Sequence, residues 1–459
     1  MTEPKLALLS LMMEQYDRWS PQLRPAQQPF LARLASFLET FGAVARLPLC
    51  TDRSAVDAAV AQAEQDQADL LVVVLLSYTP SLIALPALHR TRLPVLLLNT
   101  TPRSDMGPGI AASDYLENHA IHGVQDLANV LLRAGKRPWI ASGHLDDPAL
   151  SASVSAHIAA ARAARLWQQL RVGRVGPTFP EMGDLFFDET ALLRSGPAVL
   201  DIAPQEYADA WAEVVADDIN ALLGQYQRGY DTSRVGRDCL TTTARAECAA
   251  RSLVARHRLG ALALSFLIFE RLPAGPAMPF AAASRMMAEG IGYAGEADAL
   301  GAAGVAVLHR LTGCAGFTEM FCPDWERSEV LMSHMGEANP QFARGRPVLV
   351  EKPSLVKGGA PSGVLLFESE PGPATIASLT ASPAGGLRWV ISEGEIVPSP
   401  LYPALDAPHY KFRPRLPLPD FLTAYSEAGG SHHLALCRGQ AASAIQRLAG
   451  AIGVEFQSV

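Results

Sequence analysis

The sequence predicts an α/β protein with two Rossmann-like or flavodoxin-like parallel α/β domains, followed by a C-terminal antiparallel β-barrel domain. A chain of 459 residues is too long for one hydrophobic core. Most of it alternates short apolar runs with amphipathic helical stretches, the rhythm of βαβ units and a parallel sheet. After about Pro340 the runs become short and are separated by Gly, Pro and Ser, which is typical of an antiparallel barrel or sandwich. We therefore expect three domains, over residues 1–170, 171–318 and 319–459.

In the first domain the apolar runs predict buried parallel strands, and the amphipathic stretches between them predict helices. The strands are expected at Lys5–Met12, Leu70–Ser77, Leu93–Thr100 and Pro138–Ser142. The helices are expected over about Ala26–Phe41, from His122, and over about Ser151–Gln169. Loops at the carboxyl ends of such strands usually carry ligand contacts, and here they hold Gln15-Tyr16-Asp17, Ser77-Tyr78-Thr79, Asn99-Thr100 and Gly143-His144.

The second domain repeats the alternation, starting with a strand from Arg171. Further strands are expected near Ala198–Ile202 and Ala261–Phe266, with helices near Tyr207–Tyr226, Thr242–Arg258 and Phe280–Glu289. In the third domain the strand-length segments are Pro347–Glu351, Gly363–Glu368, Ala374–Thr380 and Leu387–Glu395. One helix, over about Gln440–Gly450, is expected to close the chain.

The composition and net charge of the chain argue against nucleic acid and membranes as partners. The chain is 49% hydrophobic and 18% charged, with a formal net charge of -8 and a pI near 5.8, so it has no basic field for nucleic acid. The longest apolar runs fall far short of the roughly 20 residues that span a bilayer. No secretory signal is evident, and the six scattered cysteines form no Cys-x-x-Cys pair. We expect a cytoplasmic protein with reduced thiols and neither nucleic-acid nor membrane partners.

Four segments in the second half each offer a carboxylate or an imidazole in a small-residue setting. They are Gly-Tyr-Ala-Gly-Glu296-Ala-Asp298, Phe-Thr-Glu319-Met, Ser-His334-Met-Gly-Glu337-Ala-Asn-Pro and Gly429-Gly430-Ser-His432-His433. Two Glu oxygens and two His nitrogens suit Mn²⁺, Mg²⁺ or Co²⁺ better than a structural zinc. The set indicates metal-assisted chemistry on an oxygen-rich small molecule.

Each segment alone has another interpretation. Gly290-x-Gly292-x-x-Gly295 matches the dinucleotide fingerprint, but a helical stretch precedes it and a carboxylate follows it, so we expect no nucleotide cofactor. The glycines would instead let Glu296 project into a site, or Glu296 would cap a helix from Ala297. Glu319 has apolar neighbours and needs either exposure or a partner, whereas His334 among methionines could be an ordinary core residue.

Taken together, the segments resemble the L-arabinose isomerase family of the arabinose/fucose isomerase-like superfamily. The four segments are similar, in the same order, to its Gly-Phe-Gly-Ala-Glu-Gly-Asp, Met-Glu-Asp, Ala-His-Met-Leu-Glu-Val-Cys-Pro and Gly-Gly-Thr-His-His. Further upstream, Asn118-His-Ala-Ile-His122 resembles Asn-Gln-Thr-Ala-His, and Glu14-Gln15-Tyr falls where Ser-Gln-His stands. Met278-Pro-Phe280-x-x-x-Ser-Arg-Met-Met resembles Leu-Pro-Gly-x-x-x-Gln-Arg-Leu-Met.

The resemblance implies that Glu296, Glu319, His334 and one of the terminal His pair hold a divalent ion, usually Mn²⁺. By position we choose His433 as that ligand. The family also implies substrate contacts from Gln15, His122, Phe280 and His432. It further implies a homo-oligomer, trimeric or hexameric, whose site is shared, with Gln15 and His122 reaching in from a neighbouring subunit.

The implied reaction is aldose–ketose isomerisation of a sugar through a cis-enediol, with Glu296 and Glu319 as base and acid. Two departures from the family pattern, at Phe179-Pro-Glu-Met182 and after Glu319, suggest the same chemistry on a different sugar. A metal-dependent carbohydrate lyase, epimerase or hydrolase is the first alternative. A non-catalytic sugar-binding protein is the second.

Overall fold

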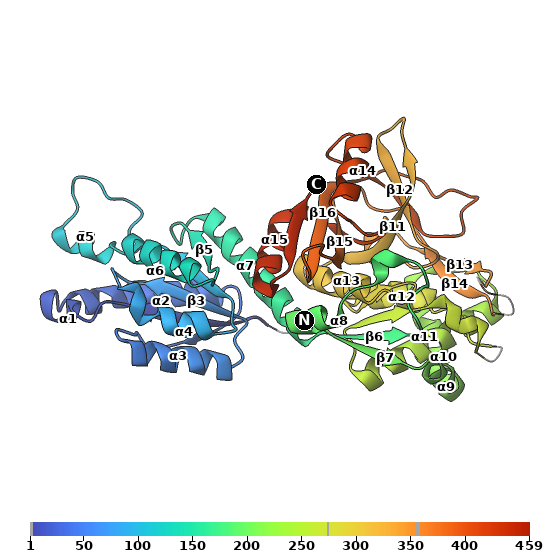
Figure 1. The fold of residues 1–459 in the computed structure, drawn as a ribbon, viewed down its shortest axis with the longest axis horizontal. Helices are drawn as coiled ribbons and strands as arrows, with labels where there is room; N and C mark the ends of the chain where they lie inside the picture. The colour runs from blue at the N-terminus through green and yellow to red at the C-terminus, as the bar shows by residue number, and fades with distance from the viewer. Residues whose placement is uncertain (1–2, 273–274, 355, 357–358) are drawn as a thin grey trace. The chain divides into compact units, whose positions relative to one another are not determined.

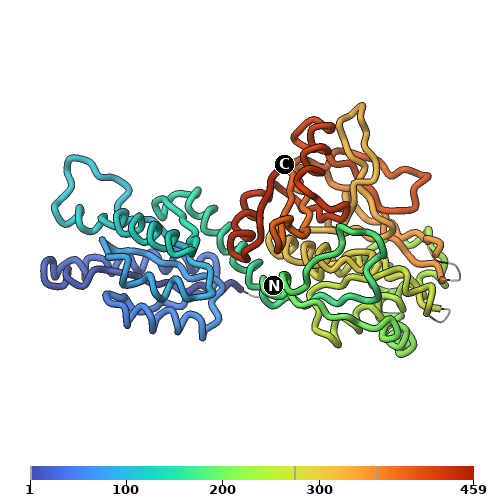
Figure 2. The backbone as a smooth tube through the Cα atoms, in the orientation of Figure 1, coloured from blue at the N-terminus to red at the C-terminus, as the bar shows by residue number. Residues whose placement is uncertain are grey.

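The computed structural model describes residues 3–272, 275–354, 356 and 359–459 (Figures 1 and 2). The chain divides into two compact units, residues 1–165 and 166–459. Among the described residues no helix is both long enough and apolar enough to cross a membrane.

The first unit is built on a five-stranded, wholly parallel sheet with the order β2-β1-β3-β4-β5. Its strands are β1 (Lys5–Leu11), β2 (Ala43–Arg46), β3 (Leu70–Leu75), β4 (Val95–Asn99) and β5 (Trp139–Ser142). The strand order reverses between β1 and β3, and the crevice at the carboxyl ends there is where such sheets bind ligands. Gln15 follows β1 at that edge.

Helices cover both faces of this sheet (Figure 1). On one face lie α2 (Leu23–Glu39) and α7 (Pro148–Gln169), and on the other α3 (Arg53–Gln65), α4 (Leu85–Arg90) and α6 (Ile121–Arg133). In α2 the buried Phe30, Leu34 and Leu38 repeat every four residues, so one helical stripe meets the sheet. The short elements are α1 (Tyr16–Trp19), η1 (Ser81–Ile83) and α5 (Ala112–Glu117).

The second unit begins with a parallel sheet in the order β10-β9-β6-β7. Its strands are β6 (Arg171–Val175), β7 (Ala198–Ile202), β9 (Ala261–Leu264) and β10 (Gly292–Ala294). The helices of this part are η2 (Gly183–Leu185), α8 (Glu189–Ser195), α9 (Pro204–Glu213), α10 (Ala216–Gly229), α11 (Arg237–His257), η3 (Phe266–Glu270), α12 (Phe280–Ala288) and α13 (Ala299–Thr312).

Most of the remaining strands of the second unit form a closed antiparallel barrel. Six strands follow the order β15-β18-β11-β12-β17-β16, and β16 pairs back with β15. They are β11 (Ala315–Asp324), β12 (Glu329–Ser333), β15 (Gly372–Ala381), β16 (Leu387–Val397), β17 (His409–Pro414) and β18 (His433–Arg438). Around it lie η4 (Pro340–Phe342), α14 (Leu418–Glu427) and α15 (Ala442–Ile452). The predicted fold class, two parallel α/β sheets and a C-terminal antiparallel barrel, is confirmed.

Helix α13 lies between the parallel sheet and the barrel, where it contacts β9 and β10 on one side and β11, β15 and β18 on the other. Nearly all of it is buried, and its sequence is dominated by Ala, Gly, Val and Leu. A Cβ on Gly304 would lie 3.3 Å from the ring of Trp389, so the packing here is tight. Because its side chains are small, the parallel sheet and the barrel can both pack closely against α13. The candidate site lies at the N-terminus of this helix.

The structure differs from the predicted elements in three places. The helix expected over Tyr207–Tyr226 is two helices, α9 and α10, because Val214 and Val215 adopt extended backbone angles. The two segments near 347–351 and 363–368 form β13 (Val348–Lys352) and β14 (Ser362–Leu366), which join β8 (Asp231–Arg234) in a separate sheet. The chain ends not with a helix but with β19 (Glu455–Ser458), which pairs with β16 in parallel.

The close packing of Gly292 in β10 against α13 can be tested through protein stability. A Cβ on Gly292 would lie 2.0 Å from the carbonyl oxygen of Ala302, which cannot move away alone. We expect Gly292→Ala to lower the free energy of unfolding by about 1–3 kcal/mol or more. Gly450→Ala is the control, since a Cβ there meets nothing within 4 Å in α15. It should raise stability by about 0.5–1 kcal/mol. Equal urea midpoints for the two variants would contradict the close packing.

Candidate metal centre

Three neighbouring barrel strands bring three of the predicted site residues together. In the antiparallel register Glu319 on β11 lies opposite His433 on β18. On its other side Glu319 lies opposite Ser333 on β12, and His334 is the next residue. Strand pairing thus brings Glu319 close to His334, 15 positions away, and to His433, 114 positions away. Phe317, two residues before Glu319, packs edge-on against both imidazoles at 4.7 and 4.8 Å between ring centroids.

Glu296 reaches the same place from the parallel sheet, in the turn between β10 and α13. Both Glu296 and Ala297 have left-handed backbone angles, with φ of 50° and 57°. Non-glycine residues rarely adopt this conformation, and where they do they cluster at functional sites. The cap of α13 is Asp298, whose carboxylate accepts the Gly301 N–H at 2.9 Å. Glu296 is therefore not the helix cap, and its side chain is free to enter the site.

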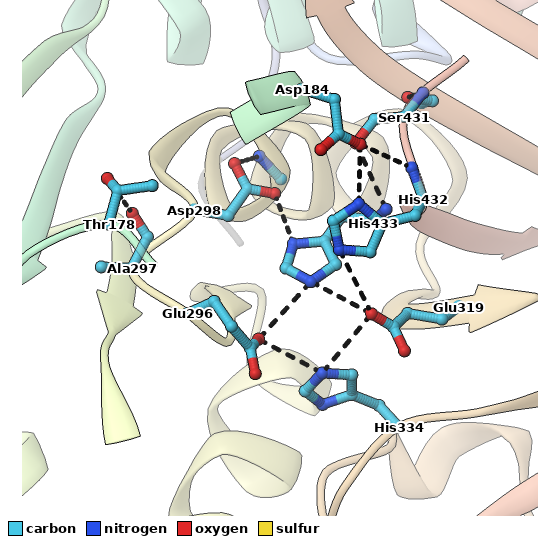
Figure 3. Close-up of polar contacts among 12 residues, drawn as sticks. Thr178, Asp184, Glu296, Ala297, Asp298, Glu319, His334, Ser431, His432 and His433 are labelled. Carbon is cyan, nitrogen blue, oxygen red and sulfur yellow. Dashed lines mark hydrogen bonds and ion pairs between the residues drawn. The ribbon is translucent and has the colours of Figure 1, made fainter. Parts of the chain in front are cut away.

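The four side chains face one another (Figure 3). Nε2 of His433 lies 3.4 Å from Oε2 of Glu296 and 3.2 Å from Oε1 of Glu319. Nε2 of His334 lies 3.3 Å and 3.9 Å from the same two oxygens. Glu296, His334 and His433 are buried, and Glu319 is only 18% exposed. The structure thus brings Glu296, Glu319, His334 and His433 into one cluster.

A second carboxylate stands behind each buried imidazole. Nδ1 of His433 is hydrogen-bonded to Oδ2 of Asp298 at 3.0 Å. Nδ1 of His334 lies 3.0 Å from Oε1 of Glu337, without the alignment of a hydrogen bond. Carboxylates in this position orient metal-ligating histidines and raise their basicity. Each Nε2 is consequently aimed at the centre of the cluster.

The excess of carboxylates shifts the titration of the cluster. Burial alone would lower the pKa of His334, but Glu337 and Glu296 raise it to about 10. Burial would also lower the pKa of His433, but the carboxylates of Asp298, Glu296 and Glu319 close to the ring outweigh it and hold this pKa well above its usual value. Burial would raise the pKa of Glu296, whereas the two imidazoles hold it well below its usual range. The cluster therefore favours a cation at its centre.

The residues fit a divalent metal ion as that cation. Oε2 of Glu296 and Nε2 of His433 are buried and have no hydrogen-bond partner, although they face each other. Unpaired buried polar atoms of this kind are costly unless something binds them. Glu296, His334 and His433 form one group of possible metal ligands, and Glu319, His432 and His433 form another. Ligand atoms about 2.1 Å from an octahedral ion lie about 3 Å apart, close to the spacing observed here.

His432 is placed differently from His433. Its side chain is 40% exposed, and its Nε2 lies 3.7 Å from Oε1 of Glu319. Its Nδ1 binds Oδ2 of Asp184 at 2.6 Å. Burial would raise the pKa of Asp184, but hydrogen bonds from His432 and Ser431 lower it to about 2. His433 belongs to both ligand groups and His432 to one, which favours His433 as the ligand.

The turn before the His pair explains its glycines. Gly429 has a left-handed φ of 75°. A Cβ on Gly430 would lie 2.3 Å from the ring of Tyr425, whose hydroxyl donates to the Ser431 carbonyl at 2.7 Å. The two glycines let the chain turn tightly against Tyr425 before β18 begins.

A cavity of about 370 Å³ opens beside the cluster. Its polar wall is formed by Glu296, His334 and Glu337, and the rest is mostly apolar, formed by Phe179, Met182, Leu264, Phe266, Met278, Phe280 and Met335. The predicted substrate-contact residue Phe280 thus lines the cavity next to the cluster. The volume falls in the range typical of small-molecule sites.

The other two predicted contact residues belong to the first unit. Gln15 lies directly after β1, at the N-terminus of α1. His122 lies in the first turn of α6, where its ring contacts His119, which in turn contacts Tyr78 after β3. Both residues therefore occupy the carboxyl-end edge of the first sheet.

Three residues with clear roles in the geometry were not predicted as site residues. Asp298 and Glu337 lie within the segments that carry Glu296 and His334, at +2 and +3, and that spacing is the signal that could have found them. Asp184 had no such signal. It contacts His432 across 248 positions and follows the loop that departs from the family pattern.

The fold and cluster together define an α/β protein with a buried two-carboxylate, two-imidazole centre at the junction of a parallel sheet and a barrel. Sequence comparison identifies the family. The L-arabinose isomerase central domain matches residues 190–313, and the L-arabinose isomerase C-terminal domain matches residues 314–455. Together the matches cover more than half of the chain, which belongs to the L-arabinose isomerase family.

Full-length relatives agree. The chain is similar to the L-arabinose isomerase of Nocardioides sp. (strain ATCC BAA-499 / JS614), at 27% identity over 89% of this chain and 84% of the relative. The enzyme of Acidothermus cellulolyticus is 28% identical over 89% and 82%, and that of Geobacillus stearothermophilus 26% over 83% and 78%. The family consists of aldose–ketose isomerases, which are intramolecular oxidoreductases, and the prediction of this enzyme class is confirmed.

The different positions of His432 and His433 predict different effects of their alanine variants on metal binding. We expect His433→Ala to weaken Mn²⁺ binding by far more than tenfold, because it removes an atom that faces both Glu296 and Glu319. His432→Ala should change the affinity less than about threefold, since its Nε2 approaches Glu319 alone. Isothermal titration of both variants with Mn²⁺ measures the difference. A larger loss in His432→Ala would reverse the assignment.

Proposed function

We propose that the protein is a metal-dependent aldose–ketose sugar isomerase that acts through a cis-enediol. The observation that carries the proposal is the convergence of Glu296, Glu319, His334 and His433 within a region that matches the L-arabinose isomerase family. The relatives named above are L-arabinose isomerases. The departing loop at Phe179–Met182, which lines the cavity, favours a sugar other than L-arabinose.

The proposed metal ligands are Glu296, Glu319, His334 and His433, and the proposed ion is Mn²⁺, with Mg²⁺ or Co²⁺ as alternatives. The mixed oxygen and nitrogen donor set and the absence of thiolates among the four support this choice. A bound divalent ion would supply Lewis acidity to the carbonyl and hydroxyl oxygens of the sugar.

Glu296 and Glu319 are the proposed base and acid. In the direction from aldose to ketose, one carboxylate removes the proton from C2 and the other carboxyl group delivers a proton to C1, while the proton of the C2 hydroxyl moves to the C1 oxygen. The two carboxylates come from different elements and flank Nε2 of His433 at 3.4 and 3.2 Å. A positioned acid or base typically contributes on the order of a hundredfold to ten-thousandfold to the rate.

The complete site is proposed to form in a cytoplasmic homo-oligomer, a trimer or hexamer. The cavity beside Glu296 is mostly apolar on its remaining walls, so it offers few partners for the hydroxyls of a sugar. Gln15 and His122 from a second copy of the chain would supply polar contacts. Their common place at the carboxyl-end edge of the first sheet supports this role.

Exchange of deuterium from solvent tests the reaction. The Mn²⁺-loaded protein is incubated with a panel of aldoses and ketoses in D₂O and followed by NMR. Interconversion of an aldose with its ketose, with deuterium incorporated at carbon, is the expected result. Exchange or cleavage without a ketose would identify a lyase or epimerase instead, and no change on any sugar would indicate a binding protein.

Two isosteric variants test the roles of the carboxylates in the same assay. We expect Glu296→Gln and Glu319→Gln each to lower turnover at least a hundredfold while the circular dichroism spectrum is retained. Glu326→Gln, in the exposed turn between β11 and β12, is the control and should keep full turnover. Measured metal content separates loss of the ion from loss of proton transfer. Retained turnover in either site variant would refute the acid–base assignment.

A further inference from the structure

One loop of the second unit contacts both the turn that carries Glu296 and the turn that carries the His432–His433 pair. After β6 the chain runs through Phe179 and Met182 to η2. The Phe179 N–H donates to the carbonyl of Glu296 at 3.1 Å, so the loop supports the strained turn of that residue. A few residues later, Asp184 binds the turn that leads into β18 (Figure 3).

Asp184 makes three hydrogen bonds through a single oxygen. Its Oδ2 accepts from Oγ of Ser431 at 2.9 Å, from the backbone N–H of His432 at 3.0 Å and from Nδ1 of His432 at 2.6 Å. Oγ of Ser431 in turn accepts the backbone N–H of His433 at 3.3 Å. Three donors satisfy this oxygen well, and the bond to Nδ1 is short. The His432 ring is consequently held at both its backbone and its side chain.

The bond to Asp184 determines which nitrogen of His432 carries the proton. A carboxylate can only accept, so Nδ1 must be the donor. In a neutral imidazole the other nitrogen, Nε2, is then an acceptor. Nε2 lies 3.7 Å from Oε1 of Glu319, which is also an acceptor. Two acceptors at this distance flank a position that a hydroxyl donor can occupy.

We propose that Asp184 is a positioning residue that holds His432 with Nδ1 protonated, so that Nε2 accepts a hydrogen bond from a sugar hydroxyl beside Glu319. The inference rests on the proposed isomerase function. Asp184 itself does not line the cavity and acts through His432. The ring is 40% exposed, so a substrate can reach it without displacing Asp184.

Asp184→Ala is the most direct test, because it removes the oxygen that accepts from Nδ1, whereas an Asn could place its amide oxygen where Oδ2 stands and keep all three hydrogen bonds. Without this acceptor nothing holds the proton on Nδ1 of His432. Asp188→Ala is the matched control. Asp188 lies in the same stretch, caps α8 through the Thr190 N–H at 2.8 Å and makes no contact with the His pair.

The first measurement is the tautomer of His432 by ¹⁵N NMR on protein labelled at histidine, with the signal assigned from His432→Gln. We expect Nδ1–H in the unchanged protein and in Asp188→Ala, and a shift toward Nε2–H in Asp184→Ala. This readout needs no substrate, so it stands even if the protein turns over no sugar. An unchanged tautomer in Asp184→Ala would overturn the proposal.

The second measurement is the kinetics on whichever sugar the exchange panel identifies. Asp184→Ala should lower kcat/KM about tenfold to a hundredfold, chiefly through KM. The same loss is expected for His432→Gln, and the double variant should lose little more than either single variant, because the two residues act as one unit. Mn²⁺ affinity should stay within threefold of the unchanged protein. Additive losses, or a parallel loss of Mn²⁺ binding, would contradict the positioning role and identify His432 as a metal ligand.

Discussion

The arrangement of the site depends on the carboxylate of Asp298, which makes two hydrogen bonds to different parts of the fold. Oδ1 of Asp298 caps helix α13 through the Gly301 N–H, and Oδ2 binds Nδ1 of His433 on strand β18. The first bond belongs to the parallel sheet and its helix, and the second belongs to the barrel. A cap of this kind is worth about 1 kcal/mol to the helix. Because the same side chain orients His433, the junction between the two layers and the aim of a proposed metal ligand are fixed together.

The closed barrel fixes the positions of the other three side chains of the cluster. His433, Glu319 and His334 come from three adjacent strands, and their meeting depends on register. A slip of one residue in β11 would turn Glu319 to the opposite face of the sheet. A closed six-stranded barrel resists such a slip, because each strand is held on both sides. The strained turn at Glu296 and Ala297 then adds the one proposed ligand that does not come from the barrel.

Much of this arrangement was predictable from the sequence, for identifiable reasons. Apolar runs such as Leu70–Leu75 and the change of texture after Pro340 reflect burial and strand length, which are local properties. The segments around Glu296, Glu319, His334 and His433 were identified by resemblance to a family. The structure adds the contacts that bring these residues together. Their roles as ligands and as acid and base stay predictions.

The elements that were missed depend on long-range contacts. Strands β13 and β14 have the composition of barrel strands, and only pairing with β8 separates them. The break between α9 and α10 falls at Val214 and Val215, which carry no Gly or Pro signal. Asp184 reaches His432 from 248 residues away. No local pattern contains that information.

Glu296, Glu319, His334 and His433 are proposed to bind one divalent ion together. Anomalous X-ray diffraction at the manganese edge, on crystals grown with Mn²⁺, would locate that ion. We expect a single strong peak within about 2.5 Å of a side-chain atom from each of the four residues. A peak bound by Glu319, His432 and His433 without Glu296 and His334, or no peak in the cluster, would contradict it.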